Sequence, residues 1–285
     1  MKIPMLRFIF PMIPAAALAA PAPVDFHDHL GIQMWSLRDT AKTSVPAAFD
    51  LVKTYGLTEI ETAGLGDLTL DRYKAELQAR GLVAIGTHAG YEELGKNLDG
   101  VITTAKTLGA RYIVCPWIPH PKEGFSIEQA HAVAKDFERW GRAIRAAGLS
   151  FGWHPHGFEF AKSADGDSPF AVIVRETSAE NVIFEMDVFW VFHAGEDPVA
   201  LLKQYPERWR LMHVKDIRKG AATGLSTGGA PATDNVAVGQ GQIDWPAVLR
   251  IAQEVGVQHF ILEDETPAPL QCIPQSLDYL RGLKL

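Results

Sequence analysis

The sequence has few cysteines, no basic run and no long apolar stretch beyond its first residues. Only Cys115 and Cys272 are present among 285 residues, too few for a disulfide framework, and we expect both to be packed thiols. No internal stretch of eighteen apolar residues predicts a membrane span. The net charge is −7, and no series of Lys and Arg could neutralise the phosphates of a nucleic acid. We therefore expect no nucleic-acid partner and no membrane partner for the mature chain, whereas the charge says little about neutral sugars.

The first residues have the pattern of a secretory signal peptide. Lys2 and Arg7 precede a mostly apolar run at 8–17, and small residues follow up to Ala20 and Ala22, near which cleavage is expected. This pattern predicts a signal peptide at 1–22 and an exported protein, periplasmic or extracellular. The alternative is a cytosolic extension without regular structure, because two prolines interrupt the apolar run.

Removal of this leader leaves about 265 residues, which fits one large barrel at 23–285 better than two average domains. Short β-branched or apolar runs alternate with longer amphipathic segments, as expected of successive βα units. The eight expected strands are Ile32–Ser36, Glu59–Thr62, Val83–Thr87, Tyr112–Pro116, Ser150–His154, Val182–Asp187, Arg210–Lys215 and His259–Glu263. Several of the intervening helices end at a glycine, which provides a left-handed C-cap: Gly56, Gly81, Gly109, Gly148 and Gly256.

A doubly wound open sheet is the competing fold, and it normally places a glycine-rich phosphate loop directly after its first strand. The sequence Trp-Ser-Leu-Arg-Asp at 35–39 stands there instead. The sequence therefore favours a single (β/α)8 TIM barrel. The segment Lys219–Gln242, rich in Gly, Ala and Thr, is expected to be a long loop on the catalytic face, either covering the substrate or forming a flexible insertion.

Acidic residues and a histidine recur where the later strands end, which is where barrel enzymes collect their functional groups. Glu159 lies just past the fifth expected strand, Asp187 ends the sixth, His213 lies in the seventh and Glu263 ends the eighth. Separations of 28, 26 and 50 residues correspond to one βα unit each, the last one lengthened by the long loop. Four adjacent strands would then direct three carboxylates and one imidazole at a common point.

Clustered carboxylates in a partly dry pocket repel one another unless a cation compensates them. We therefore predict one divalent metal ion bound by Glu159, Asp187, His213 and Glu263. Oxygen-rich ligation with one imidazole suits Mn2+, Mg2+ or Co2+ and admits Zn2+. Taken singly, each of these residues could instead cap a helix or form a salt bridge.

Several motifs in a fixed order resemble the sugar phosphate isomerase/epimerase family of xylose-isomerase-like barrels, over nearly all of the mature chain. The motifs are GIQMWSLRD (31–39), GWHPHGFEF (152–160), FEMDVFWVFHAGEDP (184–198), LMHVKD (211–216) and VGQGQIDWPAVL (238–249). The resemblance implies a Glu, Asp, His, Glu metal set, carried here onto the four residues above. In related epimerases the first ligand lies on strand five itself, so His154 or His156 could replace or supplement Glu159.

The resemblance also implies proton abstraction next to a carbonyl group of a small carbohydrate, with Glu159 and Glu263 as the candidate acid/base pair. A substrate-facing shell is expected from residues at or beyond the strand ends: Gln33, Trp35, His88, Trp117, His154, His156, Trp190, Lys215 and Arg218. For the three tryptophans the alternative is ordinary packing, and for Lys215 it is an ion pair with Asp187 or Glu265.

The leading functional hypothesis is isomerisation or epimerisation of a sugar or keto-sugar. A lyase or hydrolase that eliminates the aglycone of an oxidised (3-keto) glycoside would use the same proton removal, and the sequence does not separate the two. An AP-endonuclease-like nuclease would need more metal-binding histidines and a basic face, and a non-catalytic sugar-binding barrel would not need the metal. A homo-oligomer is compatible with the sequence.

Overall fold

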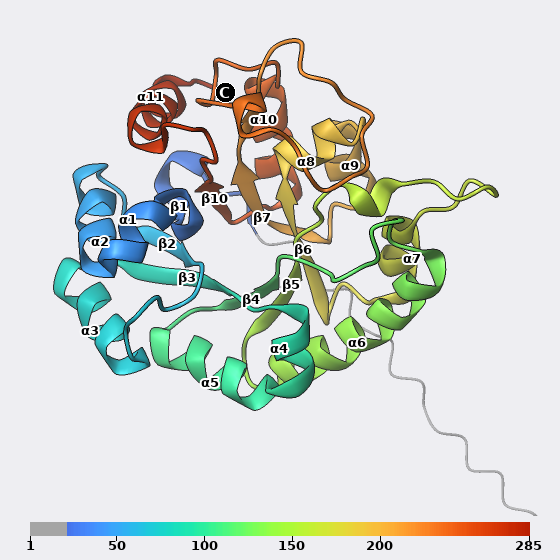
Figure 1. The fold of residues 1–285 in the computed structure, drawn as a ribbon, viewed down its shortest axis with the longest axis horizontal. Helices are drawn as coiled ribbons and strands as arrows, with labels where there is room; N and C mark the ends of the chain where they lie inside the picture. The colour runs from blue at the N-terminus through green and yellow to red at the C-terminus, as the bar shows by residue number, and fades with distance from the viewer. Residues whose placement is uncertain (1–21) are drawn as a thin grey trace, which may run out of the picture.

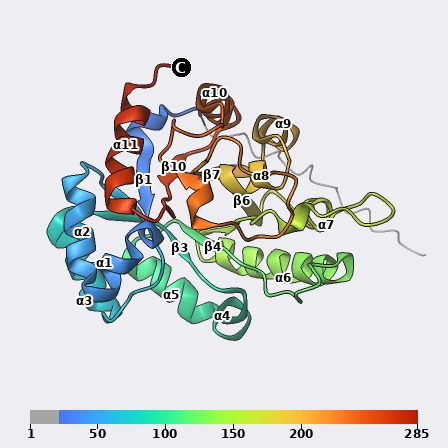
Figure 2. The same cartoon turned by 45° about the horizontal axis from the view of Figure 1, so that its top comes forward.

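The computed structural model describes residues 22–285, so all but the last residue of the expected signal peptide lies outside the described residues. Eight parallel strands close into a barrel in the order β1-β10-β7-β6-β5-β4-β3-β2. The strands are β1 (Leu30–Gln33), β2 (Glu59–Thr62), β3 (Val83–His88), β4 (Tyr112–Cys115), β5 (Ser150–Trp153), β6 (Val182–Asp187), β7 (Trp209–Val214) and β10 (His259–Leu262). The predicted TIM barrel is confirmed, with helices around the strands (Figures 1 and 2).

The helices follow the strands along the chain. They are α1 (Arg38–Thr43), α2 (Val45–Thr54), α3 (Leu70–Arg80), α4 (Tyr91–Lys96), α5 (Leu98–Leu108), α6 (Ile127–Ala146), α7 (Pro169–Glu176), α8 (Val188–His193), α9 (Pro198–Gln204), α10 (Trp245–Val255) and α11 (Pro269–Gly282). Short 3-10 turns are η1 (Phe26–His29), η2 (Met34–Leu37), η3 (Phe158–Phe160) and η4 (Ala232–Asp234). Within residues 22–285, none of these helices has the length and apolar character needed to cross a membrane.

Local sequence signals explain most element boundaries. All five of the predicted C-cap glycines have positive φ, between 62° and 90°, which only glycine adopts at low cost. The first strand is the exception, because it ends at Gln33 rather than Ser36. The Gln33 side chain accepts a hydrogen bond from the Trp35 backbone N–H and thereby caps η2, so the chain turns at the barrel rim.

The interior of the barrel is layered, because every second residue of a strand points inward. The middle layer is apolar and consists of Ile85, Tyr112, Val114, Ile183, Leu211 and Ile261. Two residues further along β6, β7 and β10 the inward positions become polar: Glu185, His213 and Glu263. The apolar layer therefore forms the floor beneath a polar chamber at the C-terminal ends of the strands.

The predicted long loop lies on this same face of the barrel, beside α8 (Figure 1). It is tied at its base by a two-stranded antiparallel ribbon of β8 (Asp216–Ile217) and β9 (Asn235–Val236). The Asp216 carboxylate accepts hydrogen bonds from the backbone of Gly239 and Gly241 and from the Trp245 indole. The motif VGQGQIDW therefore folds the returning end of the loop around one buried carboxylate.

Candidate active site

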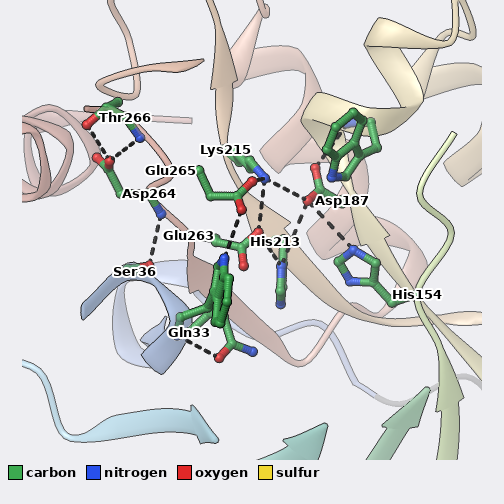
Figure 3. Close-up of polar contacts among 12 residues, drawn as sticks. Gln33, Ser36, His154, Asp187, His213, Lys215, Glu263, Asp264, Glu265 and Thr266 are labelled. Carbon is green, nitrogen blue, oxygen red and sulfur yellow. Dashed lines mark hydrogen bonds and ion pairs between the residues drawn. The ribbon is translucent and has the colours of Figure 1, made fainter. Parts of the chain in front are cut away.

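Three of the four predicted ligands converge at the C-terminal end of the barrel. Asp187, His213 and Glu263 come from β6, β7 and the end of β10, and one ligand atom of each lies within 4.8 Å of the others. His213 Nδ1 lies 3.4 Å from Glu263 Oε2 and 3.9 Å from Asp187 Oδ2. Figure 3 shows the three side chains directed into one space, with Asp264 turned the other way toward Thr266.

His154, rather than Glu159, lies beside this group, and it also belongs to a second possible ligand group with His88, Glu185 and His213. His154 follows β5 directly, and its Nε2 lies 3.7 Å from Asp187 Oδ2 (Figure 3). The Glu159 carboxylate instead accepts the backbone N–H of His156 at 3.0 Å. The reason is local: the chain turns at Gly157, with φ 93°, into η3, which folds Glu159 back onto its own turn. The structure thus does not bring Glu159 into the group, and it places His154, one of the two histidines left open as a replacement, next to Asp187.

Two further carboxylates, which the sequence reasoning missed, lie beneath the histidines. Glu61 Oε2 lies 2.8 Å from His213 Nε2, and Glu185 Oε2 lies 2.8 Å from His154 Nδ1. Both carboxylates are fully buried. Each histidine therefore has one ring nitrogen hydrogen-bonded to a buried carboxylate and its other nitrogen turned toward Asp187 or Glu263. Protein histidines that bind metals commonly have this arrangement, because the second bond fixes the tautomer and the ring orientation.

Three of the atoms that face the common space lack hydrogen-bond partners among the described residues. His154 Nε2, Asp187 Oδ2 and His213 Nδ1 are buried and unpaired among the described residues. Leaving buried polar atoms unpaired costs about 1–3 kcal/mol each, and a cation removes that cost. Two imidazoles and two carboxylates also form a donor set that divalent metals accept. His154, Asp187, His213 and Glu263 therefore fit a divalent metal ion and are the residues that would hold it.

The charges around this group are unevenly compensated. Burial raises the pKa of Asp187 to about 7, although Lys215 opposes the shift. Burial alone would also raise the pKa of Glu263, but Lys215 and His213 hold it well below its ordinary range. At neutral pH Glu263 is therefore ionised, while Asp187 is partly protonated and needs more positive charge than the protein supplies.

Lys215 provides the fixed positive charge of the site. Its Nζ lies 3.2 Å from Glu263 Oε2 and 3.8 Å from Asp187 Oδ2, and it is also paired with Glu265. Burial would lower the pKa of this ammonium, but the three carboxylates outweigh burial and raise it. Although Lys215 is only 2 % exposed, the carboxylates therefore keep it charged, and it fixes the orientation of Glu263.

The other residues of the predicted shell divide into an inner and an outer group. Gln33 and His88 belong to the inner network, where both contact Glu61, at 2.8 and 3.0 Å. Trp35 lies at the rim, 47 % exposed, and its indole N–H donates to Glu265.

Trp117, His156 and Trp190 form an aromatic cluster, called here the aromatic wall. The His156 ring lies between Trp117 and Trp190, with centroid distances of 5.2 and 5.3 Å. The tip of the long loop packs against this wall, because a Cβ on Gly228 would come within 3.4 Å of Trp117. Arg218 is bound to Asp234 inside the loop ribbon and makes no polar contact with the metal-ligand group among the described residues.

Comparisons with known proteins place the chain in a family. The chain belongs to the xylose isomerase-like TIM barrel family, whose model matches residues 49–283. A protein named inosose dehydratase from Mesomycoplasma hyopneumoniae strain J is 26% identical over 204 residues. That match covers 62% of this chain and 66% of the relative, so it spans just under two thirds of the relative's length.

Solved structures share the fold. A sugar phosphate isomerase/epimerase from Parabacteroides distasonis ATCC 8503 superimposes with a TM-score of 0.73 at 21% identity, over 96% of this chain and 98% of that one. The IolI protein, in a crystal structure with a bound zinc atom, has a TM-score of 0.62 at 16% identity, over 89% and 95%. At these identities the likeness establishes the barrel, and the chemistry has to come from the site.

Proposed function

We propose that this protein is a divalent-metal-dependent enzyme that removes the proton next to a carbonyl group of a small carbohydrate. The observation that carries the proposal is the arrangement of His154 and His213. One ring nitrogen of each histidine is hydrogen-bonded to a buried carboxylate, and the other nitrogen faces Asp187 or Glu263. A non-catalytic sugar-binding barrel would not need unpaired polar atoms buried at one point.

A metal ion held by these four residues would supply Lewis-acid stabilisation for the negative charge that develops on the substrate oxygen. Two imidazoles among the ligands shift the preference from Mg2+ toward Mn2+, Co2+ or Zn2+.

Glu263 is the group that we assign to proton transfer. It is ionised, and its Oε2 faces His213 and Lys215, which leaves Oε1 for the substrate. Lys215 prevents the carboxylate from rotating and lowers its proton affinity, so that the proton taken from carbon can be given back. We do not assign this role to Glu159, the other predicted acid/base residue, because its carboxylate accepts the backbone N–H of His156 at 3.0 Å.

Return of the proton to the neighbouring carbon or to the opposite face gives an isomerase or epimerase, which is our leading assignment. The second candidate is a lyase, in which the same carbanion expels a leaving group from the adjacent carbon, such as water or the aglycone of a 3-keto glycoside. The similarity to inosose dehydratase, whose name denotes elimination of water, favours this second outcome.

We also propose that the substrate lacks phosphate. Phosphorylated sugars are mainly cytoplasmic, whereas the leader-like segment at 1–22 predicts export. The partner is then a neutral keto-sugar, an inosose or a 3-keto glycoside.

The test is proton exchange in deuterated water with metal-loaded enzyme and a panel of ketohexoses, inososes and 3-keto glycosides, followed by NMR and mass spectrometry. Deuterium at the carbon next to the carbonyl, with an isomeric product, supports the isomerase. Loss of water or aglycone supports the lyase. Glu263→Gln and His213→Ala are expected to abolish exchange in either case while the circular dichroism spectrum is retained. Wild-type exchange rates in both variants would refute the assigned site.

A further inference from the structure

A second group of potential ligands lies at the opposite end of the barrel, where the strands begin. His29 precedes β1, Glu59 starts β2 and His259 starts β10. These three strands are neighbours, since β1 pairs with both β10 and β2. The three residues are far apart in the sequence and meet only because the barrel closes at β1.

The three side chains are in direct contact. His259 Nδ1 lies 2.7 Å from Glu59 Oε2, and His29 Nδ1 lies 3.3 Å from Glu59 Oε1. One ligand atom from each residue lies within 4.8 Å of the others.

The strand register and a glycine produce this arrangement. Leu30 pairs with Phe260, which places His29 beside His259, and Gly31 pairs with Glu59. A Cβ on Gly31 would lie 3.2 Å from the Cβ of Glu59, so glycine at this inward position leaves room for the Glu59 side chain. The ligand atoms are thus brought together by the backbone of three paired strands rather than by mobile surface chains.

The apolar middle layer separates this group from the candidate active site. Tyr112 and Ile261 belong to that layer, and the Tyr112 ring packs edge-on against His259, 5.7 Å away. Nothing that binds at the lower end would therefore contact His154, His213 or their carboxylates. On the other side the group reaches the surface, because the His29 side chain is 36% exposed.

We propose that His29, Glu59 and His259 form a second divalent-metal site, distinct from the catalytic one and selective for a borderline metal such as Zn2+. Two imidazoles and one carboxylate are a donor set that suits Zn2+, Co2+ and Ni2+ and suits Mg2+ and Ca2+ poorly.

A metal at this point links the residue before β1 to the last barrel strand. His29 directly precedes β1 and His259 starts β10, and the pairing of these two strands closes the barrel. A ligand that binds only the folded state stabilises it by an amount that grows with ligand concentration over its dissociation constant. The expected role is therefore structural, in keeping with the N-terminal face of barrels, where residues serve stability rather than catalysis.

The test counts bound zinc on the full chain by isothermal titration and by metal analysis after gel filtration. The catalytic site is first weakened with Asp187→Asn, which leaves the lower end of the barrel untouched. We expect the double variants Asp187→Asn/His29→Ala and Asp187→Asn/Glu59→Gln to bind one equivalent of Zn2+ fewer than Asp187→Asn itself. The matched control is Asp187→Asn/His131→Ala, because His131 pairs with Glu176 at 2.7 Å but has no third ligand within residues 22–285. The control is expected to keep its zinc.

Thermal unfolding gives a second measurement. Zn2+ is expected to raise the Tm of Asp187→Asn and of the His131 control by the same amount, and to raise the Tm of the His29 and Glu59 double variants less. Unchanged zinc equivalents in both of those variants would overturn the proposal, whatever the outcome for the catalytic site. Cobalt loaded into Asp187→Asn should show visible absorption that both double variants reduce and the His131 control does not.

Discussion

The carboxylate beneath His213 is expected to control metal affinity without touching the metal. Glu61 is fully buried, and its Oε2 lies 2.8 Å from His213 Nε2 and 2.8 Å from the Gln33 amide nitrogen. Its other oxygen, Oε1, has no hydrogen-bond partner among the described residues and faces Gly86. In Glu61→Gln the amide nitrogen can take the place of Oε1, so the new carbonyl oxygen stays opposite His213 and only the charge is lost.

The magnitude follows from the change of acceptor. A hydrogen bond to a charged group is worth about 1.5–3 kcal/mol and a neutral one about 0.5–1.5 kcal/mol. The difference of about 1–2 kcal/mol corresponds to roughly 5- to 30-fold weaker metal binding, within the range typical of residues that orient metal ligands. The buried amide also lowers the free energy of unfolding, by about 1–3 kcal/mol.

The assay is a competition titration of metal-free protein with a chromogenic chelator, which reports Kd and stoichiometry separately. We expect Glu61→Gln to bind the same number of equivalents with one of them weakened. The control is Glu138→Gln, which removes another hydrogen-bonded carboxylate, one that accepts from the Ser178 backbone at 3.0 Å and makes no polar contact with the site. Equal metal Kd values for wild type and Glu61→Gln would refute the claim that Glu61 orients His213.

Three other changes are expected to give distinct outcomes. Glu159→Gln should bind as many metal equivalents as wild type in the same titration, because burial raises the pKa of this carboxyl to about 8 and it is protonated at neutral pH. Loss of one metal equivalent in this variant would show that Glu159 is a metal ligand. Gly241→Ala should destabilise the fold by about 2–4 kcal/mol in urea unfolding, because a Cβ would overlap the Asp216 carboxylate; a wild-type midpoint would contradict this account of the loop base. Burial alone would raise the pKa of Glu138, but the Ser178 backbone and other donors hold it below its ordinary 4.5. The stabilisation from the ionised Glu138 carboxylate is therefore present above pH 4.5 and is lost as pH falls through the lowered pKa. The difference in unfolding free energy between wild type and Glu138→Gln should shrink between pH 6 and pH 3. A constant difference would contradict this account of Glu138.

Much of the barrel is predictable from local signals. Two strands, Glu59–Thr62 and Val182–Asp187, begin and end where the sequence predicts, because apolar runs and turn residues act within a few positions. The helix ends at glycines such as Gly81 and Gly109 are also local, since positive φ excludes most other residues there. The strand of 30–33 was displaced because the capping contact of the Gln33 side chain competes with strand extension.

The site was predictable only in part. Asp187, His213 and Glu263 follow from strand-end positions that parallel strands bring to the same face. The choice between Glu159 and His154 depends on how the chain turns after β5, which Gly157 decides through a conformation that the residue pattern does not reveal.

Glu61 and Glu185 could have been predicted from the alternation of inward and outward residues along a strand. Glu185 stands two residues before Asp187 and therefore on the same inward face of β6. Glu61 is two residues after Glu59 on β2, so that one strand contributes a carboxylate to each end of the barrel.

By itself, the sequence determined the alternation of strands and helices, the inward positions on each strand and the types of group placed there, because these depend on periods of two and 3.6 residues. Only the tertiary structure decided which nitrogen of His154 and of His213 faces a carboxylate below and which faces the open space above. Closure of the barrel also decided that His29 meets His259, since contacts between strands distant in the sequence depend on register and on the packing of the whole ring.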